Sequence, residues 1–264
     1  MKGIDKWLAL GWRHPMWDVH RFYLSLAKKK KYQKEWLEEL RAEKRIALPD
    51  GSELPIDQKT VDLFFDYYGD RNKLFEEALA LLRTEEEALE YCAKNNISVL
   101  KTATKSQDHH QSSKSMIAAV THTASQVCAA KGLALEPDPQ ARCVWCNDHD
   151  LHVSARNLDG AIPGLANPSV VWEIKEYWGK TGGGSKMSDA VYECHLVGLE
   201  LREFESRGGK NITHIVFIDG KHQWATRKSD LRRLIDLMNQ GLIDHLIIGR
   251  EVESIWESVL KSSL

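Results

Sequence analysis

Residues 169–175 limit most strongly what this chain can fold into, because apolar side chains occupy every second position and two charged side chains alternate with them at the end of the stretch. The side chains of a β-strand point alternately to its two faces. One face of a strand here would carry three apolar side chains, those of Val170, Trp172 and Ile174. The other face would carry Glu173 and Lys175 side by side. The pattern therefore predicts a strand that buries one face and presents a carboxylate and an ammonium group on the other.

A second acid, Asp159, precedes this strand and is followed by Gly160. We expect Asp159 to end an extended run over 151–159, and a hairpin-like connection would bring it beside Glu173. Two converging carboxylates suit a hard divalent cation that prefers oxygen ligands, such as Mg²⁺. A lysine beside that ion can orient a water or stabilise charge on a phosphate. The other interpretation is that these residues are solvated charges on an exposed sheet face, with Asp159 in a turn.

The arrangement resembles the PD-(D/E)xK nuclease superfamily, which includes most type II restriction endonucleases. Its two acids and lysine would correspond here to Asp159, Glu173 and Lys175. The resemblance implies that Asp159, Glu173 and the backbone carbonyl of Ile174 bind Mg²⁺, and that Lys175 activates water. In that family a proline often precedes the first acid, whereas this chain has Leu158 there.

The expected order of elements strengthens the resemblance. It reads helix, strand, strand, strand, helix, strand, over residues 113–131, 133–136, 151–159, 169–177, 186–207 and 211–218. This α-β-β-β-α-β order is the core order of the superfamily. A helix at 229–240, a strand at 244–248 and a helix at 250–261 would extend it. The expected fold is therefore α/β (α+β): a restriction-endonuclease-like core with a mixed sheet flanked by helices, after an all-α N-terminal region.

Residues 1–105 would form that N-terminal region, and 106–264 the core. Helices are expected near 17–45, 57–68, 70–82 and 84–95, with N-caps at Asp57, Asp70 and Thr84. No catalytic pattern is visible there, so we assign the region to DNA grip, assembly or packing. Its basic run, Lys28–Lys31, is either a solvated helical face or a phosphate contact. The polar stretch 101–114, with His109 and His110, is interpreted as a linker or loop.

The glycine-rich stretch 181–186 precedes the helix that follows the catalytic strand. Glycines permit close approach to a phosphate, and Ser185 can cap a helix whose N–H groups attract anions. Ser185 and Lys186 are therefore candidate contacts to the DNA backbone. The alternative is a flexible loop.

The sequence contains two further sets of candidate metal ligands, and it does not decide between the alternatives for either set. One is a possible zinc site with the spacing C-x2-C-x2-H-x2-H, at Cys143, Cys146, His149 and His152. These residues could equally be two thiols and two surface histidines. The other is a third acidic or polar ligand, for which the candidates are Gln126, Glu136 and Glu193.

Composition narrows the class of protein. The chain has 264 residues and a net charge of -2, which argues against a simple basic DNA-coating protein. Its five cysteines are an odd number without framework spacing, as in the reduced thiols of a cytosol. The first residues lack the apolar region of a secretory signal, and no apolar run reaches transmembrane length. We therefore expect a cytoplasmic protein that has no membrane partner.

The resemblance, together with these observations, predicts a Mg²⁺-dependent endodeoxyribonuclease that cuts double-stranded DNA, resembles type II restriction enzymes and acts as a homodimer. A nuclease of the same fold with little sequence specificity, in repair or phage defence, is the first alternative. A non-catalytic DNA- or partner-binding protein is the second.

Overall fold

The computed structural model describes residues 1–26, 30–101, 112–179 and 184–264. Lys28, Lys29, the pair His109–His110 and the glycines of 181–183 lie outside them. The chain forms two compact units, Ile4–Leu74 and a larger one of Met1–Gly3 with Phe75–Leu264. The sequence placed the boundary between residues 105 and 106. The observed division comes earlier because Cys92 and Ile97 share one apolar core with Met116.

The smaller unit is mostly helical and has an aromatic core. It contains α1 (Asp5–Leu8), α2 (Met16–Ser25), α3 (Lys30–Glu43), a hairpin of β1 (Arg45–Ala47) and β2 (Glu53–Pro55), and much of α4 (Gln58–Leu81). Asp57 accepts a hydrogen bond from the N–H of Thr60 at 3.0 Å, as its predicted capping role requires. The predicted break before Asp70 is wrong, because α4 runs through Gly69 without interruption. The Asp70 carboxylate instead pairs with Lys6 at 2.7 Å.

The larger unit is mixed α/β and is built on a four-stranded sheet. Its strands are β5 (Gly160–Ile162), β6 (Val170–Glu176), β7 (Thr213–Asp219) and β8 (His245–Ile248), in the order β5-β6-β7-β8. β5 is antiparallel to β6, whereas β6, β7 and β8 are parallel. The three parallel strands confirm the predicted strands at 169–177, 211–218 and 244–248.

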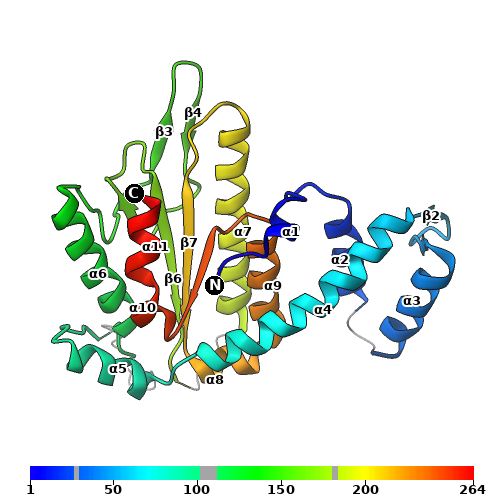
Figure 1. The fold of residues 1–264 in the computed structure, drawn as a ribbon, viewed down its shortest axis with the longest axis horizontal. Helices are drawn as coiled ribbons and strands as arrows, with labels where there is room; N and C mark the ends of the chain where they lie inside the picture. The colour runs from blue at the N-terminus through cyan, green and yellow to red at the C-terminus, as the bar shows by residue number, and fades with distance from the viewer. Residues whose placement is uncertain (27–29, 102–111, 180–183) are drawn as a thin grey trace. The chain divides into compact units, whose positions relative to one another are not determined.

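Helices cover both faces of this sheet (Figure 1). One layer consists of α6 (Ser115–Lys131) and α11 (Trp256–Ser263), and the other of α7 (Gly184–Ser206) and α9 (Lys228–Asn239). The larger unit also contains the end of α4, α5 (Glu85–Lys94), α8 (Lys221–Thr226) and α10 (Glu251–Ser254). The capping box of Thr84 and Glu87 before α5 is confirmed, as is the left-handed Gly132 after α6. The predicted helix at 250–261 is interrupted at Ile255.

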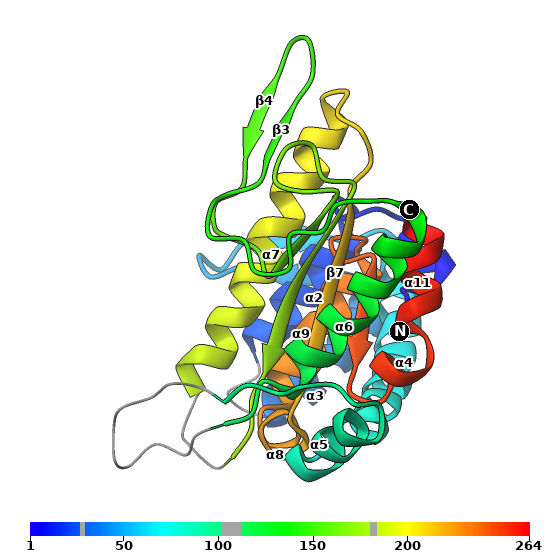
Figure 2. The ribbon, with the colours of Figure 1, turned by 90° about the vertical axis from the view of Figure 1, so that its left-hand side faces the viewer.

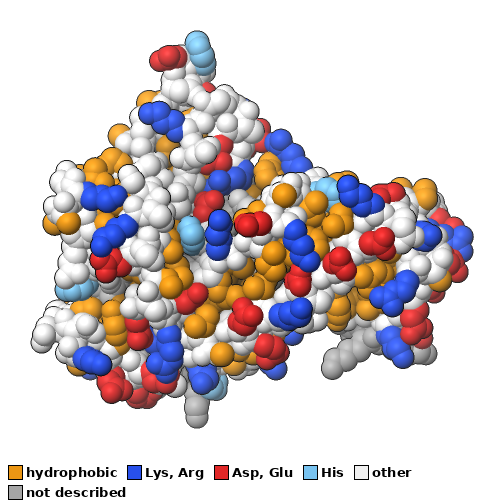
Figure 3. All heavy atoms as spheres, viewed as in Figure 1, with side chains coloured by type: hydrophobic (Ala, Val, Ile, Leu, Met, Phe, Trp, Pro, Cys, Tyr) orange, Lys and Arg blue, Asp and Glu red, His pale blue; other side chains and the backbone are white. Residues whose placement is uncertain are grey.

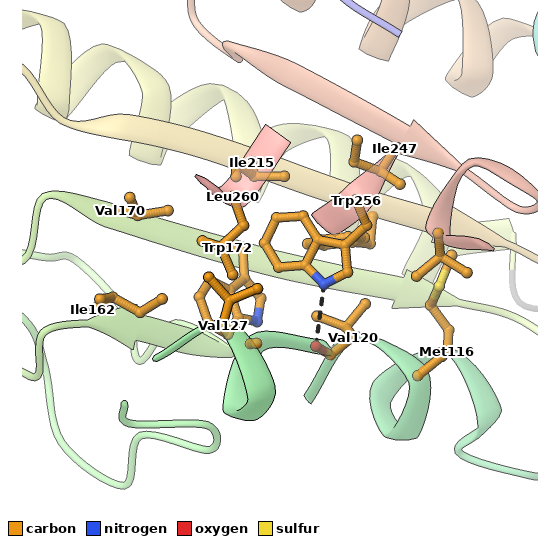
Figure 4. Close-up of a cluster of buried hydrophobic side chains, with 14 of the residues drawn as sticks. Met116, Val120, Val127, Ile162, Val170, Trp172, Ile215, Ile247, Trp256 and Leu260 are labelled. Atoms are coloured by element: carbon orange, nitrogen blue, oxygen red, sulfur yellow. Dashed lines mark hydrogen bonds between the residues drawn. The ribbon is translucent and has the colours of Figure 1, made fainter. Parts of the chain in front are cut away.

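The alternation along β6 is confirmed, but both of its faces are buried. Trp172 packs with Trp256 of α11 in the core that α6 covers, where the Trp256 Nε1–H donates to the Val120 carbonyl at 3.2 Å (Figure 4). On the other face, Val171 packs with Val197 of α7. Parallel strands are usually covered on both sides, which explains why the charged face is not solvated.

Two predicted strands are wrong. Within the run 151–159, only β4 (Leu151–Val153) is a strand, and it pairs with β3 (Val144–Cys146) in a hairpin that projects beyond the main sheet (Figure 2). The run at 133–136 makes a single bridge, between Glu136 and Ala161. The sequence missed β5, whose three residues show no periodicity. A Cβ at Gly160 would lie 1.9 Å from the Trp172 indole, so the lack of a side chain there allows β5 to reach β6.

None of the described helices combines the length and apolarity that crossing a membrane requires.

Candidate active site

Asp159 lies immediately before β5 and is bound to β6. Its N–H donates to the Trp172 carbonyl at 3.0 Å, and its Oδ2 accepts the N–H of Ile174 at 2.7 Å. The predicted hairpin-like connection therefore does bring Asp159 to the main chain between Glu173 and Lys175. It does so from the start of β5, not from the end of a strand over 151–159.

Among the described residues, no strand pairs with the edge of β6 beside Asp159, here called the open edge. β5 pairs with β6 only as far as Trp172, so Ile174 lies beyond the last paired residue. A strand residue directs its N–H and its carbonyl toward the same neighbouring strand. The Ile174 carbonyl therefore faces the same edge as the N–H that Asp159 accepts. A carboxylate and a carbonyl oxygen are thus placed together without a strand between them.

Glu173 and Lys175 form the centre of a cluster of charges on the α7 side of β6. The Lys175 Nζ lies 2.5 Å from Glu173 Oε2 and 2.7 Å from Glu193 Oε2 of α7. Arg156, from the loop between β4 and β5, has its Nη1 3.3 Å from Glu173 Oε2 and also contacts Glu193. The cluster therefore joins three segments that are distant in the sequence.

The centre of this cluster is buried and its rim is not. The side chains of Glu173 and Lys175 are 1% and 6% exposed, while those of Arg156 and Glu193 are 31% and 39% exposed. Among the described residues, no donor makes a hydrogen bond of acceptable geometry to either oxygen of Glu173. A buried carboxylate with only ionic contacts has unused capacity for a ligand.

The charges of the cluster act on Asp159. Burial raises the pKa of the Asp159 carboxyl above its ordinary value, while the Ile174 N–H and the charge of Lys175 oppose this shift. Burial also raises the pKa of the neighbouring Cys194 thiol on α7. A carboxyl that is costly to ionise in isolation would be stabilised as a carboxylate by a bound cation.

Asp159 and Ile174 also line a pocket of about 410 Å³ on the side of the sheet that α6 covers. Polar groups around it include those of Lys114, which precedes α6, and of Thr121 and His122 on α6. The pocket wall is completed by residues of the segments 97–100 and 137–138. The open edge of β6 is therefore accessible from this side.

Of the three candidates for a further ligand, the structure brings only Glu193 into the cluster. Gln126 is exposed on α6 and bonds His122, and Glu136 makes a backbone bridge to Ala161. The sequence did not suggest Arg156 at all. It lies in an irregular loop, and its only signal was its closeness to Asp159 along the chain.

The other candidate DNA contacts, Ser185 and Lys186, lie in the first turn of α7 and are exposed. Ser185 is inside the helix, which begins at Gly184, so it does not occupy the predicted capping position. Lys186 precedes Glu193 by two helical turns, which places both on one side of α7 about 10 Å apart.

The possible zinc ligands do not converge. Cys143 is buried in a core beneath α7, whereas Cys146 is exposed. His152 stacks between Trp145 and Phe204, and His149 is exposed in the hairpin turn, whose tip carries acidic and histidine side chains (Figure 3). Within the described part of the chain, no three or more His, Cys, Asp or Glu side chains form a group suited to a metal ion. A cation site at Asp159 and Glu173 would thus use two carboxylates and backbone oxygen.

Comparison with known proteins gives a family without an activity. No curated protein and no solved structure matches the chain. One family matches residues 75–263, which is nearly all of the larger compact unit. The chain belongs to this family, described as "Domain of unknown function (DUF7687)".

Proposed function

We propose that the protein is a Mg²⁺-dependent endodeoxyribonuclease that resembles type II restriction enzymes and cuts phosphodiester bonds in double-stranded DNA. One observation carries the proposal. Asp159 is hydrogen-bonded to the backbone between Glu173 and Lys175, whose side chains lie 2.5 Å apart and buried. Buried charges of this kind are costly and are often found at functional sites.

The arrangement of the larger unit supports a restriction-endonuclease-like core. After α6 come the bridge at Glu136, the hairpin of β3 and β4, and then β5, β6, α7 and β7. Apart from this hairpin, and with β5 in place of the predicted strand over 151–159, the order is that of the predicted core. Its first strand is reduced to one bridge, and the first acid stands before β5. The pairing of Glu136 with Ala161, and of β5 with β6, places these three segments side by side.

The residues present fit a divalent cation. Glu173 has two buried oxygens that lack a hydrogen bond from the described residues, and Asp159 and the Ile174 carbonyl add oxygen ligands at the open edge. These are the ligand types that Mg²⁺ prefers. A bound Mg²⁺ would polarise the phosphodiester and lower the pKa of a water.

The protein's own side chains would position and neutralise the reacting groups. Lys175 keeps an ammonium group beside Glu173, where it can orient the attacking water and stabilise charge that develops on the phosphate. Glu193 holds this ammonium from α7 at 2.7 Å. Lys186, on the same side of α7, would contact the DNA backbone as a point charge.

We further propose that the enzyme acts as a homodimer whose N-terminal unit contributes to assembly or DNA grip. One such site cuts one strand, and a symmetric target is met by a two-fold dimer. Sedimentation of the protein alone and on DNA tests this idea. A monomer in both states that still cuts both strands together would contradict it.

The function is tested by incubating the purified protein with a fully sequenced phage DNA and Mg²⁺, and mapping the ends that form. Discrete fragments that require Mg²⁺ are expected. A smear would instead indicate a low-specificity nuclease of the same fold. DNA binding without cleavage, under all divalent cations tried, would contradict the enzyme and favour a non-catalytic DNA-binding protein.

A further inference from the structure

The carboxylate of Glu173 meets two cations on one oxygen. Lys175 Nζ and Arg156 Nη1 lie 2.5 and 3.3 Å from Glu173 Oε2. Lys175 is on the same strand and is 6% exposed, so the backbone and the surrounding core hold it in place. Arg156 comes from an irregular loop and is 31% exposed. The two cations therefore differ in how easily they can leave.

The contact of Arg156 with Glu173 is ionic and not directional. The Nη1 atom is buried, yet no described residue accepts a hydrogen bond of acceptable geometry from it. Its other ionic partner is Glu193, at the rim of the cluster. A guanidinium held by charge alone can move without breaking a specific hydrogen bond, and Glu193 would retain it at the rim.

We propose that Arg156 is an internal cation that occupies Glu173 until a divalent cation displaces it. This inference rests on the proposed function, because it concerns the same metal site. Arginine stays charged at any pH at which the protein folds, so it cannot give up its place by losing a proton. Arg156 and the divalent cation therefore compete for one buried carboxylate. The loop before β5 would thereby set how much free cation the site requires.

The test measures binding of Mn²⁺ alone, from the electron paramagnetic resonance signal of the free ion, and needs no DNA or cleavage. An opposite charge within about 4–6 Å favours the ionised form of a carboxyl group over its neutral form by about tenfold or more. Arg156→Gln should therefore bind Mn²⁺ about tenfold more tightly than the unaltered protein. Arg156→Lys keeps the charge and should stay within about twofold, which separates the charge from loop packing.

Arg207→Gln is the matched control, because it removes a positive charge that is 47% exposed and that pairs with Asp150, not with Glu173. Its Mn²⁺ affinity should not change. Glu173→Gln should lose the binding. Thermal unfolding in the absence of metal shows that each variant is folded.

The outcomes separate the two proposals. Unchanged or weaker Mn²⁺ binding in Arg156→Gln, with binding still lost in Glu173→Gln, would overturn the displacement by Arg156 and leave the metal site intact. Saturable binding that survives Glu173→Gln, or no binding in any variant, would overturn the metal site itself.

Discussion

Two buried clusters of charge in the larger unit lie at different places along the same sheet and are built differently. In the first, Arg83 donates from Nε to Asp219 Oδ2 at 2.7 Å and from Nη1 to Glu253 at 2.7 Å. Asp219 Oδ1 also accepts the N–H groups of Arg83 and Gly220, each at 2.9 Å. In the second, Glu173 lies against Lys175 and Arg156 with no well-formed hydrogen bond from the described residues.

The difference distinguishes a cluster whose contacts are complete from the proposed metal site. A buried ion pair stabilises a fold only when its geometry is good and its remaining hydrogen-bonding capacity is satisfied. The cluster of Arg83 meets both conditions at 0% exposure of Arg83 and Asp219. In the cluster of Glu173, Lys175 does donate a hydrogen bond to Glu193 at 2.7 Å, but neither oxygen of Glu173 accepts one from the described residues. An incomplete set of contacts is the state expected of a site that is completed by a ligand. The predictions below test this contrast.

The largest effect is expected on cleavage. Asp159→Asn, Glu173→Gln or Lys175→Met should lower the cleavage rate by at least about 1,000-fold, because in the proposed mechanism each removes a group that would bind the metal or stabilise the reacting phosphate. The free energy of unfolding of Glu173→Gln should stay within about 1 kcal/mol of the parent, since a neutral amide is cheaper to bury. Plasmid cleavage and urea unfolding measure the two effects.

Glu257→Gln, in an exposed pair on α11, is the control for both measurements. Full cleavage by Glu173→Gln or Lys175→Met would reject the assignment.

The second effect is on stability. Arg83→Met leaves Asp219 buried without its cation and should lower the free energy of unfolding by about 3–5 kcal/mol. The fraction that remains folded should still cut DNA. Arg250→Met breaks an exposed pair with Glu87 and should cost less than about 1 kcal/mol. Urea unfolding measures both losses of unfolding free energy. Equal losses for the two arginine variants would show that the buried cluster stabilises the fold no more than an exposed ion pair does.

The third effect concerns Glu176, at the end of β6 next to Asp219 in the pairing of β6 with β7. Burial raises the pKa of Glu176 from 4.5 to about 7, opposed by hydrogen bonds from the Met116 N–H and Trp178. The Glu176 carboxyl therefore loses its proton more readily in the unfolded chain than in the folded protein. The stabilisation that comes from this raised pKa is fully present below about pH 4.5 and is lost as pH rises to about 7. Above that pH the effect of Glu176 on the free energy of unfolding no longer changes.

Glu176→Gln removes this dependence. The difference in unfolding free energy between the variant and the parent should shift in favour of the variant by on the order of 3 kcal/mol between pH 4.5 and 7. Urea unfolding at several pH values measures it. A difference that stays flat across this range would mean that Glu176 ionises normally in the folded protein.

The smallest effect is expected at the start of α7. Lys186→Ala should weaken binding of all DNA sequences similarly and lower the slope of log affinity against log salt by about 1. Lys261→Ala on α11 serves as the control, since it removes another exposed charge from a different helix. Identical salt slopes for the parent and Lys186→Ala would remove this residue from the proposed interface.

The local patterns were readable because their physical causes are local. The alternation over 169–175 reflects the two-residue period of a strand, and the capping box of Thr84 and Glu87 needs only one turn of helix. The stop at Gly132 needs only a residue that tolerates a left-handed backbone. Each of these predictions depends on a few adjacent residues, and each is confirmed.

The errors came where pairing between distant segments decided the outcome. The run 151–159 looked like one strand, but its first three residues pair with β3 while β5 pairs with β6. Strand β5, which the sequence did not predict, forms because Gly160 has no side chain and its backbone fits against Trp172, twelve residues later. Propensity over so short a segment carries little information compared with such packing.

The sequence alone determined which residues of β6 share a face, and hence that Glu173 and Lys175 would meet. The tertiary structure decided that this face is buried under α7, that Asp159 reaches the backbone at Ile174 and that Arg156 and Glu193 complete the cluster. The period of a strand is set by covalent geometry and is present in any chain that adopts it. The burial of a charge, its partners and its unused hydrogen-bonding capacity depend on segments that only the folded chain brings together.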